Sequence, residues 1–132
     1  MTVSMNSLAR AIFNSLFGAL SRNSNTNGTG VDMVDYEGVA LVQLDSAAGG
    51  AGTFDFKLQE SNDNGVSDAY ADVPTAEITG GAFTQVTTGG ASVQTRFIDL
   101  TYRKRYIRAV ATIATGPFVF SAGISGLKKY QS

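Results

Sequence analysis

Short runs of alternating apolar and polar residues, separated by glycine-containing turns, fill the chain from Val31 onward. The clearest run is residues 54–59, in which three apolar side chains alternate with three polar ones. Successive side chains of a β-strand point to opposite faces of a sheet, so this period of two indicates a half-buried strand. The Asn64-Gly65 pair that follows favours the positive φ angles of a tight turn. The pattern therefore predicts a fold of short strands.

The same pattern predicts the other strands and the fold class. Strands are expected at residues 36–44, 54–59, 83–86, 93–102, 106–113 and 118–127, with a short extended segment at 73–78. Residues 39–42 are apolar in succession, which predicts burial on both faces of their strand. About seven strands, with a turn signal every ~8–12 residues, are typical of a β-sandwich or jelly roll. The predicted fold is all-β, a jelly-roll-like β-sandwich over residues 31–132.

The first 22 residues have a different period. Asn6 or Ser7 is placed to cap a helix, and the polar run 23–30 has the composition of a flexible linker. The apolar residues at helical spacing are Leu8, Ile12, Phe13, Leu16, Phe17 and Leu20. The sequence thus predicts a short N-terminal helical arm, residues 1–22, and a linker, residues 23–30. An isolated helix of this length is marginal in water, so its apolar stripe should dock on a neighbouring subunit or on its own domain.

The chain has no histidine, cysteine or tryptophan. Catalytic triads of Ser-His-Asp type, Cys-His pairs and zinc sites all need one of the first two residues. No G-x-x-x-x-G-K-[ST] phosphate loop occurs either. A glycosidase-like carboxylate pair, Glu60 with Asp72 or Glu37 with Asp35, lacks the tryptophan that would help to stack a sugar. We therefore expect no enzyme activity, no catalytic residue and no cofactor.

The acidic stretch 60–72 matches a calcium-binding loop only in part. Aligning Gly65 with the glycine of an EF-hand loop places Glu60, Asn62 and Asn64 at ligand positions. Ala71 then stands where a bidentate acid is required, and the pattern predicts no flanking helices. We expect a solvated acidic loop without a metal site, and a loose cation site is the alternative.

Charge is segregated along the chain, although the net charge is only −1. Residues 23–95 hold ten acids and one lysine, whereas residues 96–132 hold seven bases and one acid. The bases interleave with strand-forming residues, which favours oppositely charged strands facing each other in one sheet over a nucleic-acid-binding tail. The densest basic group is Arg103, Lys104 and Arg105, which we expect to contact an acidic protein surface.

The sequence has no apolar run of the ~20 residues that a membrane-spanning helix needs. The N-terminal residues also lack the charge-then-apolar order of a secretory signal. We therefore expect no membrane partner, and we expect the protein to be made in the cytoplasm. The charge pattern described above also leads us to expect no nucleic-acid partner.

Several short segments resemble small head proteins of tailed bacteriophages. They are VDMVDYEGV at 31–39, FKLQES at 56–61, YADVP at 70–74, RYIRAV at 105–110 and SAGISG at 121–126. The commoner pattern has a tryptophan in the third segment, where this chain has Tyr70, and the N-terminal arm is an addition. The resemblance spans residues 31 to 127.

That group comprises cement or decoration proteins with β-sandwich or jelly-roll folds, which sit outside the capsid and lock neighbouring capsid subunits. The resemblance implies a virion protein, made in the host cytoplasm, that binds the major capsid protein and further copies of itself, with a trimer favoured. The expected protein-interface residues are Leu8, Ile12, Phe13, Leu16, Phe17, Leu20, Arg103, Lys104 and Arg105. The alternative function is a receptor- or carbohydrate-binding module of a head fibre or tail.

Overall fold

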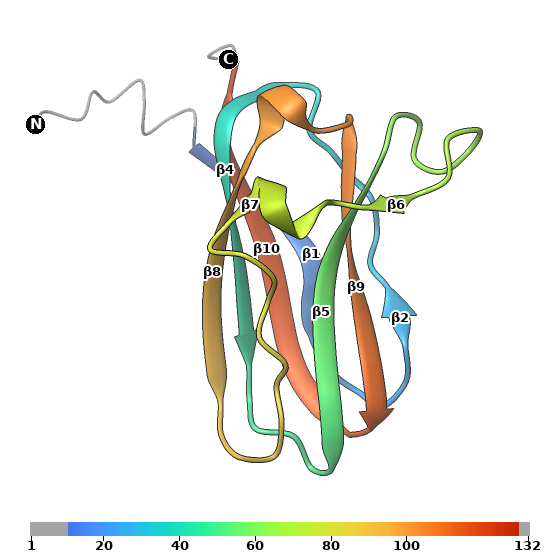
Figure 1. The fold of residues 1–132 in the computed structure, drawn as a ribbon, viewed down its shortest axis with the longest axis vertical. Helices are drawn as coiled ribbons and strands as arrows, with labels where there is room; N and C mark the ends of the chain where they lie inside the picture. Colours follow the sequence, from blue (N-terminus) through green and yellow to red (C-terminus); the bar gives the residue numbers. More distant parts are fainter. Residues whose placement is uncertain (1–10, 130–132) are drawn as a thin grey trace, which may run out of the picture.

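The computed structural model, which describes residues 11–129, contains two five-stranded antiparallel sheets packed as a sandwich (Figure 1). Sheet A has the order β1 (Ala11–Arg22), β10 (Phe118–Lys128), β4 (Tyr36–Ser46), β8 (Ser92–Asp99), β7 (Ile78–Thr79). Sheet B comprises β2 (Thr26–Asn27) and β3 (Val31–Asp32), both paired with β9 (Tyr106–Thr115), then β5 (Gly52–Ser61) and β6 (Ala71–Asp72). Two short 3₁₀ turns, η1 (Thr75–Glu77) and η2 (Leu100–Tyr102), complete the elements. The predicted all-β sandwich is confirmed.

The long strands of the domain follow the predicted alternation closely. β4, β5, β9 and β10 overlap the predicted runs almost completely, and β8 ends early because η2 takes its last residues. The turn after β5 has φ angles of 59° at Asn64 and 80° at Gly65, as predicted. The predicted strand at 83–86 is reduced to one bridge between Val86 and Phe54. The prediction that residues 39–42 are buried on both faces is wrong. Sheet B covers only one face of β4, and Val39 on the other face is 57% exposed.

The predicted N-terminal helix is wrong over the residues that the structure describes. Residues 11–22 form β1, which pairs with β10 at the edge of sheet A. The register shifts between Ser15 and Phe17 and again before Leu20. A bulge breaks the period of two, so the adjacent residues Leu16 and Phe17 both reach the core. The resulting spacing of apolar residues imitates a helix. Leu8 lies outside the described residues.

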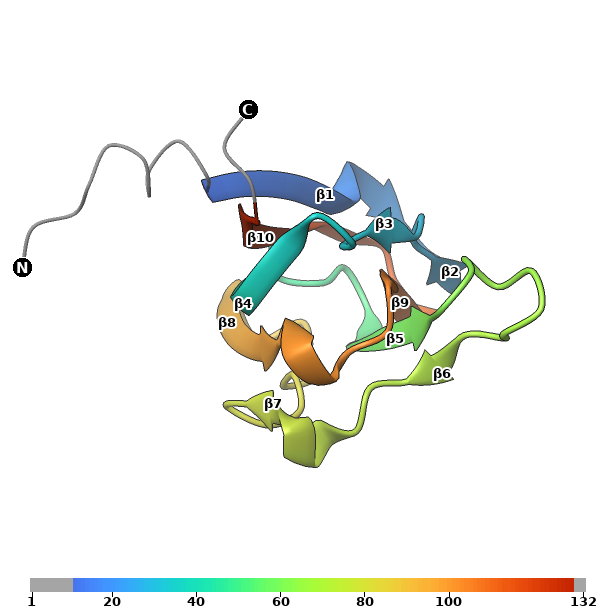
Figure 2. The same ribbon diagram turned by 90° about the horizontal axis from the view of Figure 1, so that it is seen from above.

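The polar segment 23–30 is tied to sheet B by strand pairing and by hydrogen bonds of its backbone and of the Asn25 side chain. β2 pairs with β9, and the Ile113 N–H donates to Asn25 Oδ1 over 2.8 Å. The Gly28 N–H donates to the Ala109 carbonyl over 2.7 Å. A Cβ on Gly28 would lie 2.7 Å from the Leu16 carbonyl oxygen, so this close crossing requires glycine. The segment carries the chain from sheet A to sheet B along one side of the sandwich (Figure 2).

Aromatic side chains from both sheets fill the core. The rings of Phe54 and Phe120 stack with centroids 4.2 Å apart, and Phe17 meets Phe120 edge-on at 5.2 Å. The Arg22 guanidinium lies 4.8 Å from the Phe120 ring centroid and 4.9 Å from the Phe17 ring centroid. It therefore covers these two rings with a cation–π contact. β1 is thus packed into the sandwich. Within residues 11–129, no helix is long and apolar enough to cross a membrane.

Candidate functional site

The outer face of sheet B carries a network of polar side chains. Lys57 Nζ lies 2.9 Å from Asp72 Oδ1. Arg108 donates two hydrogen bonds to Gln59 Oε1, of 2.9 and 2.7 Å, and its guanidinium lies 4.1 Å from the Tyr70 ring centroid. Lys57 and Asp72 thus form an ion pair on this face, and Arg108 has its hydrogen-bond and ring partners within the chain.

The outer face of sheet A carries most of the exposed large apolar side chains of residues 11–129. The residues of this face alternate along each strand with the buried core residues, so the side chains of this face point away from sheet B. The apolar members are Phe13 (66% exposed), Val39 (57%), Val93 (72%), Phe97 (42%), Val119 (49%), Leu127 (39%) and the half-buried Leu41. We call this set the apolar face. Contiguous exposed apolar patches mark interaction sites on soluble proteins, which makes the apolar face the candidate functional site.

Strand register brings Phe13, Leu41 and Phe97 of the apolar face into one cross-strand row. Phe13 of β1 pairs with Ser125 of β10, Ser125 pairs with Leu41 of β4, and Leu41 pairs with Phe97 of β8. One cross-strand row therefore joins residues from the two ends and the middle of the sequence. Neighbouring side chains in such a row are close enough to contact each other.

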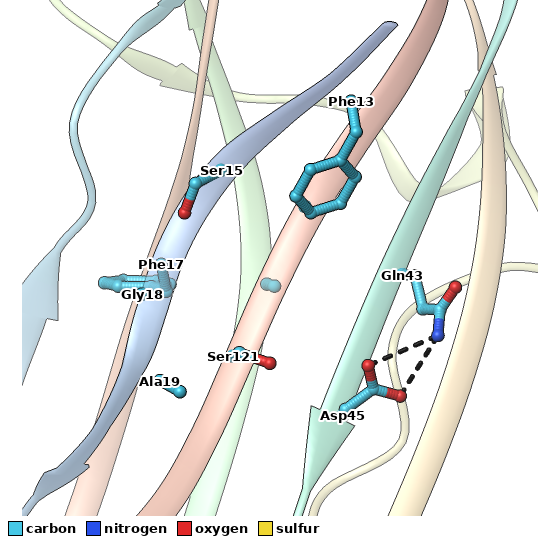
Figure 3. A pocket seen from close by; sticks show the side chains of 10 residues that line it. Phe13, Ser15, Phe17, Gly18, Ala19, Gln43, Asp45 and Ser121 are labelled. Atoms are coloured by element: carbon cyan, nitrogen blue, oxygen red, sulfur yellow. Dashed lines mark hydrogen bonds between the residues drawn. The ribbon is translucent and has the colours of Figure 1, made fainter. Parts of the chain in front are cut away.

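A groove of about 310 Å³ crosses this surface beside Phe13 (Figure 3). Its floor is β10, where Ser121 and Gly123 are small, and β1 forms one wall. The opposite wall is Gln43 and Asp45 of β4, whose side chains are joined by hydrogen bonds of 3.2 Å from Gln43 Nε2 to both carboxylate oxygens. The groove thus has an aromatic wall on one side and a carboxylate on the other.

The apolar residues of 11–22 that the sequence predicts as an interface fall into two groups in the structure, one buried and one exposed. Leu16 and Phe17 are buried in the core, at 2% and 5% exposure, and so do not reach a partner. Phe13 belongs to the apolar face, and Leu20 is 60% exposed farther along β1. Ile12 is half-buried.

Arg103, another predicted interface residue, is buried between two carboxylates. Its side chain is only 4% exposed, with Nη1 3.2 Å from Glu60 Oε2 and Nη2 2.9 Å from Glu77 Oε2. Glu60 also accepts a 2.9 Å hydrogen bond from the backbone N–H of Lys104. This cluster joins β5, the η1 segment and the chain after η2, and its guanidinium faces the protein interior.

Lys104 and Arg105 are also paired with carboxylates of the same chain. Lys104 Nζ lies 2.9 Å from Asp68 Oδ2, and Arg105 Nη2 lies 2.7 Å from Asp32 Oδ2. The hydrogen bond from Arg105 lowers the pKa of Asp32, and the one from Lys104 lowers the pKa of Asp68. Lys104 and Arg105, which with Arg103 form the basic corner, therefore meet acids of their own chain.

Asp63 organises the acidic loop through backbone hydrogen bonds. Its carboxylate accepts the N–H groups of Asp68 (3.0 Å), Ser67 (2.8 Å) and Val66 (3.1 Å). These bonds hold the pKa of Asp63 below its usual value, and the bond from Asp68 contributes most to this lowering. Across residues 11–129, no group of three or more acidic side chains is placed to hold a metal ion.

Sequence reasoning missed most of the apolar face. Apolar residues of β8 fall on both sides of the strand, with Val93 and Phe97 outside and Ile98 inside. The buried Gln94 adds to the ambiguity, because its amide bonds to the Thr84 backbone and lies on the inner side. The alternation alone gave no signal for which side of β8 faces the core.

The fold and its surface define a small all-β sandwich whose exposed apolar side chains gather mainly on the outer face of sheet A. A family model named Bbp16 matches residues 11–124, which is most of the chain. The chain belongs to the Bbp16 family, a family of Bordetella phage proteins. The resemblance to phage proteins is thereby confirmed at the level of a phage protein family. No curated protein matches the chain.

Proposed function

We propose that this protein is a cement or decoration protein, which binds the outer surface of a tailed-phage capsid and stabilises the head. The observation that carries the proposal is the apolar face of sheet A, presented by a member of a phage protein family. The proposed partners are the major capsid protein and further copies of this chain. The proposed location is the virion surface.

The strand order supports the jelly-roll form of the sandwich. β1-β10-β4-β8 in sheet A faces β2-β9-β5-β6 in sheet B, so most connections cross from one sheet to the other. Jelly rolls of two Greek keys recur in viral capsid and lectin domains. One fold serves many functions, so the strand order by itself supports only a jelly-roll capsid-type domain. The proposal that this domain binds a partner depends on the apolar face.

The contrast between the two outer faces supports docking through sheet A. The outer face of sheet B carries charged side chains, among them the Lys57–Asp72 pair, and burying them would cost desolvation. Side chains such as Val93 and Phe97 lose contact with water when a partner covers them, which contributes about 25 cal/mol per Å² of apolar area. A standard interface buries about 800 Å² per partner.

Capsid binding of this kind would stabilise the head by mass action. A protein that binds the assembled shell and not its separated subunits shifts the equilibrium toward the shell. Each contact then needs only modest affinity, because it is repeated over the whole particle and because a subunit that bridges neighbours gains from multivalency.

The test is the temperature at which virions release DNA. Complete particles, particles stripped of this protein, and stripped particles with purified protein added back are heated in the same salt. The proposal expects earlier release from stripped particles and recovery on reconstitution. Equal temperatures for all three would contradict it, and saturable binding of a glycan by the purified protein would favour the receptor- or carbohydrate-binding alternative.

A further inference from the structure

We propose that the groove beside Phe13 receives a basic side chain, arginine or lysine, from the partner protein. The charged head would bind at Asp45 while the aliphatic stem lies along the Phe13 ring. This inference rests on the proposed function for the identity of the partner, and it deepens that function by naming the chemistry that the apolar face recognises.

The carboxylate of Asp45 is not neutralised within the described part of the chain. Its two oxygens accept hydrogen bonds from the neutral amide of Gln43, at 3.2 Å each, and no cation of residues 11–129 pairs with it. It is half-buried at the edge of an apolar surface. A partner that covered the groove without supplying a positive charge would strand this carboxylate, at a substantial desolvation cost.

The polar wall of the groove presents acceptors. Gln43 directs its amide nitrogen at Asp45, so its carbonyl oxygen and the carboxylate remain as the exposed polar atoms of this wall (Figure 3). Arginine and lysine heads are donors without acceptors, and the planar guanidinium can bond two carboxylate oxygens at once. The wall therefore selects a cation over an anion or a neutral apolar group.

The rest of the groove fits the stem of such a side chain. Arginine and lysine bury their methylene groups on apolar surfaces while the charged head stays in a polar environment. The Phe13 ring offers the apolar wall, and an aromatic ring attracts a nearby cation as well. The Phe13 ring covers Gly123, and the small Ser121 leaves room on the floor beside it. The groove volume of about 310 Å³ lies at the lower end of small-ligand pockets.

The experiment measures binding of purified protein to stripped shells at low and moderate salt. Asp45→Asn keeps the shape of the side chain and removes its charge, and Asp55→Asn is the matched control on the sheet B side, where Asp55 bonds to Gln85. We expect Asp45→Asn to weaken binding about three- to ten-fold at low salt and to reduce its salt dependence. The control should bind like wild type. Wild-type affinity and salt dependence in Asp45→Asn would overturn the inference while leaving the cement function intact.

A second measurement is independent of the shell. The protein is titrated with N-acetyl-arginine amide, or with N-acetyl-leucine amide as the neutral control, and amide resonances are followed by NMR. Saturating shifts at Asp45, Ser121 and Gly123 are expected for the arginine compound alone, and they should disappear in Asp45→Asn. Unmoved resonances would overturn the inference, and saturation by a glycan instead would assign the groove to the carbohydrate-binding alternative. Failure of wild type to bind shells, with the arginine shifts present, would overturn the cement function instead.

Discussion

The ring of Phe13 on β1 lies across Gly123 on β10 and fills the place that a Cβ of residue 123 would occupy. The two residues are diagonal neighbours, since Phe13 pairs with Ser125 and Gly123 pairs with Ser15. Diagonal neighbours on one face of a sheet are within reach of aromatic side chains. The missing side chain at Gly123 therefore makes room for the ring beside the groove.

Gly123→Ala should close the groove without unfolding the protein. The new methyl group must displace the Phe13 ring, which is exposed and can rotate away, and Gly123 does not have a positive φ. We expect the free energy of unfolding in urea to change by no more than about 1 kcal/mol, while shell binding weakens. Gly90→Ala, where a Cβ would meet nothing within 4 Å, is the control. Wild-type shell binding by Gly123→Ala would refute the role given to this contact.

Phe17→Ala and Phe13→Ala should differ strongly in stability, although both residues lie in β1. Phe17 is 5% exposed and packs against Phe120, so its truncation should cost about 3–5 kcal/mol. Phe13 is 66% exposed, and its truncation should stay within about 1 kcal/mol. Urea denaturation of the two variants measures both values. Similar small losses would argue against β1 as a packed strand of the sandwich.

Arg103→Ala should destabilise the fold far more than Arg105→Ala. Removing Arg103 leaves the nearly buried carboxylate of Glu60 without its cation, which costs about 3–5 kcal/mol. The Arg105–Asp32 pair is open to solvent, so its loss should change stability only slightly. Denaturation midpoints of the two variants make the comparison. Reduced shell binding by a fully stable Arg105→Ala would place the basic corner in the partner interface.

The acidic loop should loosen in acid because of Asp63. Its pKa in the folded protein is lowered by backbone hydrogen bonds, so its stabilising effect is complete above the unfolded value of about 3.9. That effect is lost as the pH falls through the lower folded value. NMR titration of the Asp63 carboxyl carbon, with hydrogen exchange at Val66 and Ser67, measures both events. Asp63→Asn should abolish the titration, and a wild-type pKa at or above 3.9 would contradict this account.

Alternation and turn chemistry were sufficient to predict most of the long strands. β4, β5, β9 and β10 follow the period of two, and Asn64-Gly65 marks its turn. β1 could not be predicted in this way, because its bulge places Leu16 and Phe17 on the same side. Pairing with β10, at the far end of the sequence, decides its conformation, and strand propensity depends on such distant neighbours.

The candidate site depends even more on distant contacts. The row from Phe13 to Phe97 exists only once four strands are in register. The composition predicted that basic and acidic strands would face each other, yet it could not show that Arg103 meets Glu60 in a buried pair. The burial of Leu16, Phe17 and Arg103 could therefore not be predicted from side-chain chemistry alone.

The most direct test of docking through sheet A compares two double variants for binding to stripped shells. Val93→Ser with Phe97→Ser removes apolar area from sheet A, whereas Lys57→Ser with Gln59→Ser alters the outer face of sheet B. The account predicts that the sheet A variant binds at least about ten-fold more weakly, a loss of about 1.4 kcal/mol, while the sheet B variant binds like wild type. Full binding by the sheet A variant together with lost binding by the sheet B variant would contradict it.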